Sequence, residues 1–447
     1  FFPQNCCTLN GCCRAKFRPK CDTIDSLALK KTERIGIMRR KKIAIVGAGD
    51  FQLPLVQEAS KENDVVLIAP VIDKAFEPYI KERCLIDVRD QDAALNFCRE
   101  QKIDGIITDQ TDISVRTVAY VAEQMGLPGI GYEKGLLFTD KARMRDVMEA
   151  AGIPCLPNRT VTSVEDAVSF WRELEGTSVI IKPLDSQGSR GIYSCDSEED
   201  IRKHFEESAG FSSNGEVIVE KMATGMEFFV EGMAFDGTFR NLIIGDTHYF
   251  DIENAYAAES RRTPSVRNPE TVRRVLERNR EIIEAFGLKQ GLTHSEFIMD
   301  GDEIYLLETA ARGGGVYISS DLISLETGIN VEKFLVDIAL GQLQEMPKAE
   351  DTGKYSGYKA FYVPFGTVKS ISGVEEVKAL PYVHRNQLDN LHIGMDVPVE
   401  KLNKTNRLAL IVEANSEEQW LERVAHIQDI LHVECESAGT TRDLVWK

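Results

Sequence analysis

The sequence of 447 residues lacks several features that would assign a chain to a broad class of protein. It has no apolar run near the roughly 18 residues that a membrane-spanning helix needs. It has no apolar segment followed by a small-residue cleavage site near its start, no internal repeat and no low-complexity tract. Five of its ten cysteines are scattered singly and form no disulfide framework of the kind found in secreted proteins. These absences favour a cytoplasmic protein with no membrane partner.

Positive charge is scarce over most of the chain. The formal net charge is −18, which argues against general binding to nucleic acid. Residues 1–42 are the exception, with eleven Lys or Arg against three Asp or Glu. Residues 1–37 also carry five cysteines, spaced CC-x4-CC-x7-C in a way that matches no zinc-binding pattern, and they lack a periodic apolar face. We therefore expect residues 1–37 to be a disordered, Cys-rich basic extension, with Met38 a plausible real beginning.

The fingerprint for dinucleotide binding is incomplete. Ile43–Val46 is a short β-branched run, and Gly47–Gly49 follows it directly, before a helical pattern and a second strand-like run. This β-α-β pattern predicts a doubly wound domain with a parallel sheet at 38–138. Gln52 and Leu53 stand where the fingerprint would need its next glycine, so the pattern disfavours an NAD-dependent oxidoreductase.

Two glutamates occupy equivalent places in a predicted β-hairpin. Glu296 lies in one apolar run and Glu308 ends the next, with an acidic, glycine-containing turn between them. A three-residue loop at 301–303 would place the two glutamates directly opposite each other, whereas a two-residue loop would put them on opposite faces. Two like charges so close are destabilising unless a cation lies between them, and Mg²⁺ is typically held by one or two carboxylates plus substrate phosphates. The alternative is a solvated hairpin with ordinary acidic residues, which the apolar flanks disfavour.

Basic residues stand where they could meet an anion. Lys141 falls in the first turn of a predicted helix, where a cation opposes the helix dipole unless it serves an anion or points to solvent. Lys182 ends a buried-looking strand, and Arg312 follows the second glutamate strand beside three glycines that allow a ligand to approach closely. Arg261 and Arg262 are predicted to form a basic turn, which could clamp a carboxylate or phosphate or could be solvated.

A loop and a strand end complete the pattern. The Gly188–Gly191 loop is rich in Gly and Ser and can wrap phosphates with backbone N–H groups, although it lacks the GK[ST] of a P-loop and such a turn is often only a turn. A further apolar strand ends in Glu220 and Lys221, and Glu227 follows after a short turn. This arrangement could line the edge of a pocket or belong to a plain surface.

The order of these features, from about Asp140 to Gly341, resembles the ATP-grasp superfamily. The shared order is a lysine on a helix, a lysine that ends a strand, a glycine-rich loop, a Glu-Lys strand end, and two spaced glutamates followed by an arginine. The resemblance implies an α/β protein with three parts. They are a doubly wound domain with a parallel sheet at 38–138, an ATP-grasp domain at 139–345 and a small α+β domain at 355–447.

The resemblance also implies roles for single residues. Those implied to bind ATP are Lys141, Lys182, Gly188, Ser189, Glu220, Lys221, Met222 and Glu227. The implied metal ligands, for Mg²⁺ or alternatively Mn²⁺, are Glu296 and Glu308. Arg312 would be the catalytic residue that faces the transferring phosphoryl group or the substrate carboxylate, and Arg261 or Arg262 would lie near the substrate.

Two segments are similar to one branch of that superfamily. Thr293–Glu296 and Glu308–Arg312 are similar to the L-amino acid ligases of the bacilysin-synthetase type. Ala310 stands where many ATP-grasp enzymes have an Asn that serves as a further metal ligand, which leaves the number of metal ions open. The similarity implies an ATP-dependent carboxylate–amine ligase that forms an amide through an acyl phosphate. Its partners would be a small-molecule carboxylate and an amine, with an amino acid among them.

Two alternatives stay open. One is an ATP-grasp carboxylase that uses bicarbonate. The other is a nucleotide-binding regulatory protein without turnover, which Ala310 supports. The sequence does not fix the oligomeric state, and a homodimer is one option.

Overall fold

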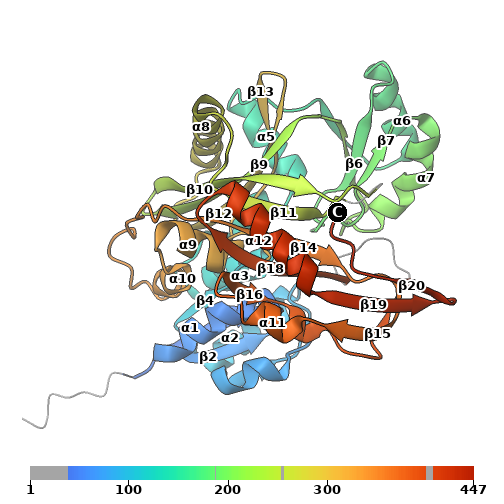
Figure 1. Ribbon diagram of the computed structural model, residues 1–447. Helices are drawn as coiled ribbons and strands as arrows, with labels where there is room; N and C mark the ends of the chain where they lie inside the picture. Colours follow the sequence, from blue (N-terminus) through green and yellow to red (C-terminus); the bar gives the residue numbers. More distant parts are fainter. Residues whose placement is uncertain (1–38, 187, 253–255, 399–405) are drawn as a thin grey trace, which may run out of the picture. The chain divides into compact units, whose positions relative to one another are not determined.

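The computed structural model describes residues 39–186, 188–252, 256–398 and 406–447. The chain divides into a short unit, Phe1–Arg40, and a compact unit, Lys41–Lys447, which contains four β-sheets (Figure 1). The expected disordered extension at residues 1–37 lies outside the described residues. Within the described ranges, no helix is long and apolar enough to cross a membrane.

The compact unit begins with a parallel sheet in the order β3-β2-β1-β4. Its strands are β1 (Lys42–Val46), β2 (Asp64–Ile68), β3 (Glu82–Cys84) and β4 (Gly105–Ile107). The helices that connect them are α1 (Leu53–Glu62) and α2 (Gln91–Gln101), and α3 (Val115–Met125) follows. Ile43 and Ile45 pack into one hydrophobic core, and Ala44 and Val46 pack into another on the opposite face. Both faces are therefore covered, which confirms the predicted doubly wound sheet.

A second sheet is antiparallel, in the order β5-β8-β6-β7. Its strands are β5 (Asn158–Val161), β6 (Val179–Pro183), β7 (Tyr193–Cys195) and β8 (Val217–Lys221). Helices α6 (Val164–Glu173) and α7 (Glu198–Ala209) lie beside it, in green in Figure 1. Val179 and Ile181 point into the core that this sheet shares with the helices. Because strand residues alternate, Ile180 and Lys182 point to the other face.

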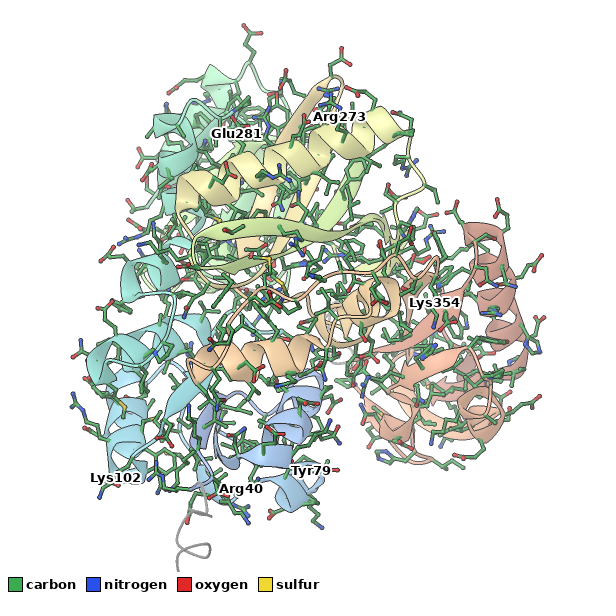
Figure 2. All side chains as sticks on the ribbon, turned by 90° about the vertical axis from the view of Figure 1, so that its left-hand side faces the viewer. Arg40, Tyr79, Lys102, Arg273, Glu281 and Lys354 are labelled. Carbon is green, nitrogen blue, oxygen red and sulfur yellow. The ribbon has the colours of Figure 1, made fainter. Side chains whose placement is uncertain are left out.

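The third sheet has eight strands in the order β13-β12-β9-β10-β11-β14-β18-β16. Its strands are β9 (Met226–Phe235), β10 (Thr238–Tyr249), β11 (Ala258–Thr263), β12 (Gly291–Asp300), β13 (Glu303–Ala310), β14 (Tyr355–Tyr362), β16 (Val383–Asn386) and β18 (Arg407–Ala414). Helix α8 (Pro269–Phe286) packs on it, and Figure 2 shows Arg273 and Glu281 on the side of α8 that points away from the protein. Val275 and Phe286 are fully buried, so α8 is amphipathic.

Strand β11 overturns one prediction. Arg261 and Arg262 do not form a basic turn, because β11 pairs with β10 on one side and with β14 on the other. Both arginines therefore lie inside the eight-stranded sheet. Successive residues of a strand point to opposite faces, so the two guanidinium groups are directed to different sides of that sheet.

The glutamate hairpin is formed by β12 and β13. Its turn has two residues instead of the predicted three, because Asp300 pairs with Glu303. A regular two-residue hairpin would put the two glutamates out of register. A β-bulge at Leu307 adds one residue to β13, and Glu296 then pairs with Glu308. The predicted pairing of the glutamates is confirmed, but the bulge produces it and the loop length does not.

The remaining helices lie between these sheets or at their edges. They are α4 (Tyr132–Leu137), α5 (Lys141–Ala150), α9 (Ile323–Thr327), α10 (Val331–Ala339) and α11 (Val374–Lys378), with short π-helical and 3-10 turns besides. Asp140 caps α5, since its carboxylate accepts a hydrogen bond of 3.1 Å from the N–H of Arg143. Lys141 therefore occupies the first turn of α5.

The C-terminal part adds a small sheet in the order β17-β15-β19-β20. Its strands are β15 (Gly366–Ser372), β17 (Asp396–Val397), β19 (His432–Ser437) and β20 (Thr440–Arg442). With α12 (Glu417–Ile430) this part has a hydrophobic core of its own, yet β14, β16 and β18 belong to the eight-stranded sheet. We keep the boundaries 38–138, 139–345 and 355–447 as a proposal.

Candidate functional site

A cavity of about 630 Å³ lies where loops of the parallel sheet, the second sheet and the eight-stranded sheet all contribute side chains. This size is in the range of small-molecule sites. Eleven of the thirteen predicted site residues line it. They are Lys141, Lys182, Gly188, Ser189, Lys221, Met222, Glu227, Arg261, Glu296, Glu308 and Arg312. Glu220 and Arg262 do not line it.

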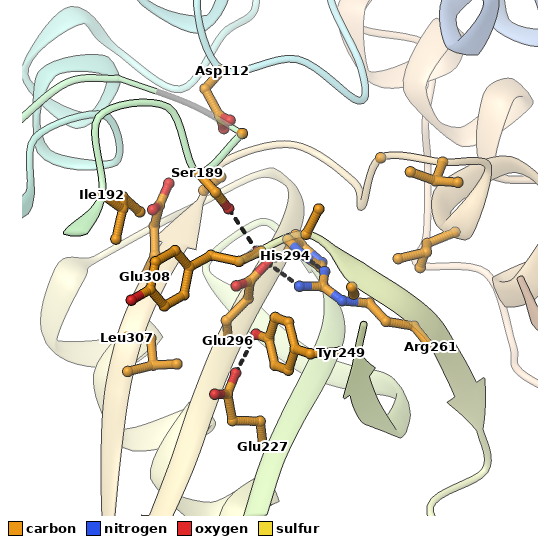
Figure 3. A pocket seen from close by; sticks show the side chains of 18 of the residues that line it. Asp112, Ser189, Ile192, Glu227, Tyr249, Arg261, His294, Glu296, Leu307 and Glu308 are labelled. Carbon is orange, nitrogen blue, oxygen red and sulfur yellow. Dashed lines mark hydrogen bonds and ion pairs between the residues drawn. The ribbon is translucent and has the colours of Figure 1, made fainter. Parts of the chain in front are cut away.

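The paired glutamates of the hairpin, both labelled in Figure 3, are each balanced by a cation. Glu296 Oε1 accepts a hydrogen bond of 2.5 Å from Arg261, and Glu308 Oε2 lies 3.1 Å from Nζ of Lys141. Burial alone would raise the pKa of Glu296, but the positive charge of Arg261 and the hydrogen bond from His294 outweigh burial and hold that pKa well below its usual range. Glu296 is therefore an anion at neutral pH, on the cavity wall beside Glu308.

The side chain of Glu220 does not reach the cavity. It is fully buried, and its two oxygens accept hydrogen bonds from Arg145 Nε and Lys182 Nζ, both at 2.7 Å. Burial alone would raise the pKa of Glu220, but the charges of Arg145 and Lys182 lower it to about 2. Sequence reasoning missed Arg145, which carries no motif and is also buried. Glu220 therefore positions Lys182 from behind the cavity wall.

The loop and strand beyond β8 bring further polar groups to the cavity. Glu227 accepts a hydrogen bond from the hydroxyl of Tyr249, a residue that sequence reasoning missed. Burial raises the pKa of Glu227, and the hydrogen bond from Tyr249 only partly offsets it. Ser189 donates a hydrogen bond of 3.0 Å to the carbonyl of Tyr256. The N–H of Met222 already donates to Ser178 at 2.9 Å, so its side chain and carbonyl are what remain for a ligand.

Arg312 is held by the parallel-sheet part of the chain. Its guanidinium makes two hydrogen bonds of 2.8 Å to the carboxylate of Asp112, which follows the C-terminal end of β4. Burial would lower the pKa of Arg312, but Asp112 raises it, so the arginine stays charged. Sequence reasoning missed Asp112. Its position could have indicated a role, because ligand sites often lie just past the C-terminal ends of parallel strands.

The three glycines after Arg312 were expected to allow a ligand to approach the backbone closely. Two of them instead lie against carboxylates of the protein. The N–H of Gly313 donates to Asp109 at 2.8 Å, and the N–H of Gly314 donates to Glu231 at 2.9 Å. A Cβ on Gly314 would lie 2.5 Å from a Glu231 oxygen. Only the third glycine, Gly315, lines the cavity.

A chain of hydrogen bonds links Glu231 to the hairpin. Glu231 bonds Nδ1 of His294, and Nε2 of His294 lies 2.8 Å from Arg261 and 3.1 Å from Glu296. Burial would lower the pKa of His294, but the charge of Glu231 and the hydrogen bonds to Glu231 and Glu296 raise it. Sequence reasoning gave no role to His294, although its spacing of two residues from Glu296 puts both on one face of β12.

Arg262 faces away from the cavity. Its guanidinium donates a hydrogen bond of 2.8 Å to Glu417 and lies over the ring of Trp420, both on α12. Of the two arginines, one or the other of which was predicted to lie near the substrate, only Arg261 lines the cavity, because the strand alternation of β11 sends Arg262 to the other face.

The glycine turn after β1 is closed by a side chain. Gln52 is buried, accepts a hydrogen bond of 2.7 Å from the N–H of Gly49 and donates one of 2.9 Å to the carbonyl of Asp109. The Gly49 N–H that a dinucleotide pyrophosphate would need is thus used within the chain. This supports the prediction that the turn does not bind NAD.

Comparison with known proteins identifies the class. Residues 175–321 match the model of the ATP-grasp domain family, which confirms the predicted ATP-grasp domain. Alanine–anticapsin ligase of Bacillus subtilis is 25% identical over 264 residues, which are 54% of this chain and 55% of that protein. The chain thus spans about half the length of the curated relatives it matches.

Solved structures share the fold over most of the chain. An L-amino acid ligase from Bacillus licheniformis has a TM-score of 0.73 at 21% identity, covering 89% of this chain and 100% of that one. The biotin carboxylase domain of a 2-oxoglutarate carboxylase from Hydrogenobacter thermophilus has a TM-score of 0.71 at 17% identity, covering 90% of this chain and 91% of that one. The predicted α/β fold, with an ATP-grasp domain and flanking parts, is confirmed.

Proposed function

We propose that this chain is an ATP-dependent carboxylate–amine ligase that forms an amide through an acyl phosphate and releases ADP and phosphate. The observation that carries the proposal is the convergence of Lys141, Lys182, Arg312 and the paired glutamates on one cavity. Phosphoryl transfer needs positioning and neutralisation of charge more than covalent work by the protein. Two of the similar proteins are named as an alanine–anticapsin ligase and an L-amino acid ligase, which supports this reaction class.

ATP binds between the second sheet and the glutamate hairpin in this proposal. Lys141 and Lys182 bind its phosphates, and Glu220 holds Lys182 in place. The Gly188–Gly191 loop, with Ser189, closes over the phosphates. Glu227 accepts hydrogen bonds from the ribose hydroxyls, and the wall at Lys221 and Met222 borders the adenine.

The hairpin carboxylates suit a divalent cation. Among the residues that the structure describes, no group of three or more His, Cys, Asp or Glu side chains could hold a metal alone. Glu296 and Glu308 are paired on one face, which is the partial ligand set that Mg²⁺ completes with phosphate oxygens and water. Mg²⁺, or Mn²⁺ in its place, would be held by these two side chains and would neutralise negative charge on the phosphates. Ala310 adds no ligand.

The chemistry proceeds in two steps. An oxygen of the substrate carboxylate attacks the γ-phosphorus of ATP, the bond to the bridging oxygen breaks, and ADP leaves. The amine nitrogen then attacks the acyl carbon, loses a proton, and phosphate leaves with the electron pair of the broken C–O bond. Arg312 stabilises the charge that develops on the phosphoryl group and on the acyl oxygen. Asp112 holds Arg312 in place with two hydrogen bonds of 2.8 Å.

Phosphate release with Mg²⁺-ATP across a panel of amino-acid pairs tests the proposal. We expect release only with particular pairs, with a loss of at least about 100-fold in Glu308→Gln. Glu303→Gln is the matched control, because Glu303 is exposed at the turn of the same hairpin and lies outside the cavity. Release that depends on bicarbonate and needs no amine would support a carboxylase instead. ATP binding without release under any mixture would support the regulatory alternative.

The oligomeric state is a separate question. The similar carboxylase domain is described as a dimer. We propose that this chain can form a homodimer as well, and light scattering at several concentrations tests it.

A further inference from the structure

Three arginines line the cavity, and one of them has no carboxylate partner in the described part of the chain. Arg261 is paired with Glu296, and Arg312 is paired with Asp112. Arg407, at the start of β18, donates one hydrogen bond of 2.9 Å to the backbone carbonyl of Ala258. Most of the N–H groups of Arg407 therefore remain available on the cavity wall. A guanidinium presents five donors in a fork that matches a carboxylate.

A buried hydroxyl lies beside Arg407. Tyr362 is directly opposite Arg407 in the register between β14 and β18, so the two side chains extend from the same face of the sheet. Tyr362 is only 5% exposed, and its hydroxyl has no hydrogen-bond partner among the residues described. An unpaired buried hydroxyl is costly. Because this hydroxyl has almost no exposed surface and Tyr362 does not line the cavity, Arg407 is the group of this pair that a ligand can reach.

Arg407 is set apart from the hairpin end of the cavity. Arg261 pairs with Tyr358 on β14, and Arg407 pairs with Tyr362 four residues further along the same strand. The backbone positions of Arg261 and Arg407 are offset by about 13 Å along the strand direction and by two strand spacings of about 4.8 Å across the sheet. The side chains of Arg261 and Arg407 shorten the distance between their charged groups. The remaining space suits a molecule of the size of an amino acid.

We propose that Arg407 binds a substrate carboxylate other than the one that is phosphorylated. The inference rests on the proposed ligase function and narrows its substrates. Either the amine carries a free carboxylate, as an amino acid does, or the acid carries a second one. A simple amine combined with a monocarboxylic acid would leave Arg407 without a ligand.

The test compares matched substrates in the wild type and in Arg407→Gln. One arm compares an amino acid with its amide as the amine substrate, and the other compares a dicarboxylic acid with its monoamide as the acid substrate. We expect Arg407→Gln to raise KM on the order of 10- to 100-fold for the carboxylate-bearing member of one arm, with the amide form and kcat little changed. Arg407→Lys should raise this KM by an intermediate factor. The arm that responds identifies which substrate carries the carboxylate.

Arg240→Gln is the matched control, because Arg240 is an exposed arginine that also donates to one backbone carbonyl, that of Pro347, and lies outside the cavity. Thermal unfolding checks that every variant is folded. Two results would overturn the inference. One is that the wild type has equal KM values for the acid and amide forms in both arms. The other is that Arg407→Gln changes the KM of the acid and amide forms by the same factor in both arms. If the wild type cleaves no ATP with any pair, the proposed function fails. Calorimetric binding of the amino acid and its amide to wild type and Arg407→Gln then decides whether Arg407 binds a carboxylate.

Discussion

The side-chain nitrogen of Lys182 donates a hydrogen bond of 2.7 Å to Glu220, which has no exposed surface. The other oxygen of Glu220 accepts from Arg145 at the same distance. One carboxylate thus balances two buried cations, of which only Lys182 lines the cavity. The position of Lys182 therefore depends on a residue that a ligand does not reach.

Glu220→Gln should destabilise the fold strongly. The substitution removes one charge from a buried ion group and leaves Arg145 and Lys182 uncompensated, a situation that typically costs about 3–5 kcal/mol. Urea unfolding at pH 7 measures the change in the free energy of unfolding. Glu173→Gln is the control, because Glu173 pairs with Arg159 at 2.7 Å in an exposed ion pair, and the loss of such a pair should change stability much less. Similar small losses in both variants would argue against the buried ion group.

Gly314→Ala should also destabilise the protein, through crowding. The new Cβ would lie 2.5 Å from a Glu231 oxygen and 2.9 Å from Nδ1 of His294, so both side chains must shift. Overpacking of this kind costs about 1–3 kcal/mol. The midpoint of urea unfolding measures it. Gly210→Ala, where the nearest backbone atom would be 3.4 Å away, should change stability by less than about 1 kcal/mol. A Gly314→Ala variant as stable as Gly210→Ala would contradict the packing.

The sequence predicts well what depends on local patterns. Four fully buried residues from Ile43 to Val46 match the β-branched run from which a parallel sheet was predicted. The first-turn position of Lys141 follows from the cap at Asp140, which is local too. The apolar runs around Glu296 and Glu308 give the hairpin, because each run reads as a strand and the turn between them has a typical composition.

Features that depend on distant partners could not be predicted. The bulge at Leu307 is a single extra residue and leaves no mark in the composition of β13. Arg261 and Arg262 look like a solvated turn because their partners, Glu296 and Glu417, lie 35 and 155 residues away. Once these carboxylates are in place, two adjacent arginines can lie inside a sheet.

A buried carboxyl group gives a pH dependence of stability. Burial raises the pKa of Glu326 to about 7, and a hydrogen bond from Thr263 only partly offsets burial. Because the folded pKa lies above that of the unfolded chain, Glu326 stabilises the fold at low pH, and this contribution is lost as pH rises from about 4.5 through about 7. Glu326→Gln removes the titration. The stability of the variant relative to wild type should therefore rise on the order of 1 kcal/mol across that range.

Urea unfolding at a series of pH values measures the difference for Glu326→Gln. Other buried acids, such as Asp109 and Glu332, titrate in both proteins and cancel in the comparison. Glu281→Gln, on the exposed side of α8, is the control for the removal of a carboxylate (Figure 2). A flat difference for Glu326→Gln would mean that Glu326 titrates normally in the folded protein.

Nucleotide and metal should bind this chain with strong mutual dependence. Glu308 already pairs with Lys141 at 3.1 Å and Glu296 with Arg261 at 2.5 Å, so a metal ion alone must compete with two cations for two carboxylates. With nucleotide present, Lys141 turns to phosphate, the carboxylates are released, and phosphate oxygens complete the metal's ligand set. Calorimetry should therefore detect no binding of Mg²⁺ alone below millimolar concentrations. ADP should bind at least about 10-fold more tightly with Mg²⁺ than with a chelator, a coupling of about 1.4 kcal/mol or more.

The same titrations distinguish the contribution of the hairpin carboxylates to ADP binding from that of the other cavity residues. Glu308→Gln should abolish the effect of Mg²⁺ on ADP affinity, because one carboxylate of the pair is gone. In the chelator titration Glu308→Gln should bind ADP no more weakly than wild type, since the substitution also frees Lys141 to meet the phosphates. The exposed turn variant Glu303→Gln should behave as wild type in both titrations. Tight binding of Mg²⁺ without nucleotide, or a full Mg²⁺ effect in Glu308→Gln, would place the metal elsewhere and remove the role proposed for Glu296 and Glu308.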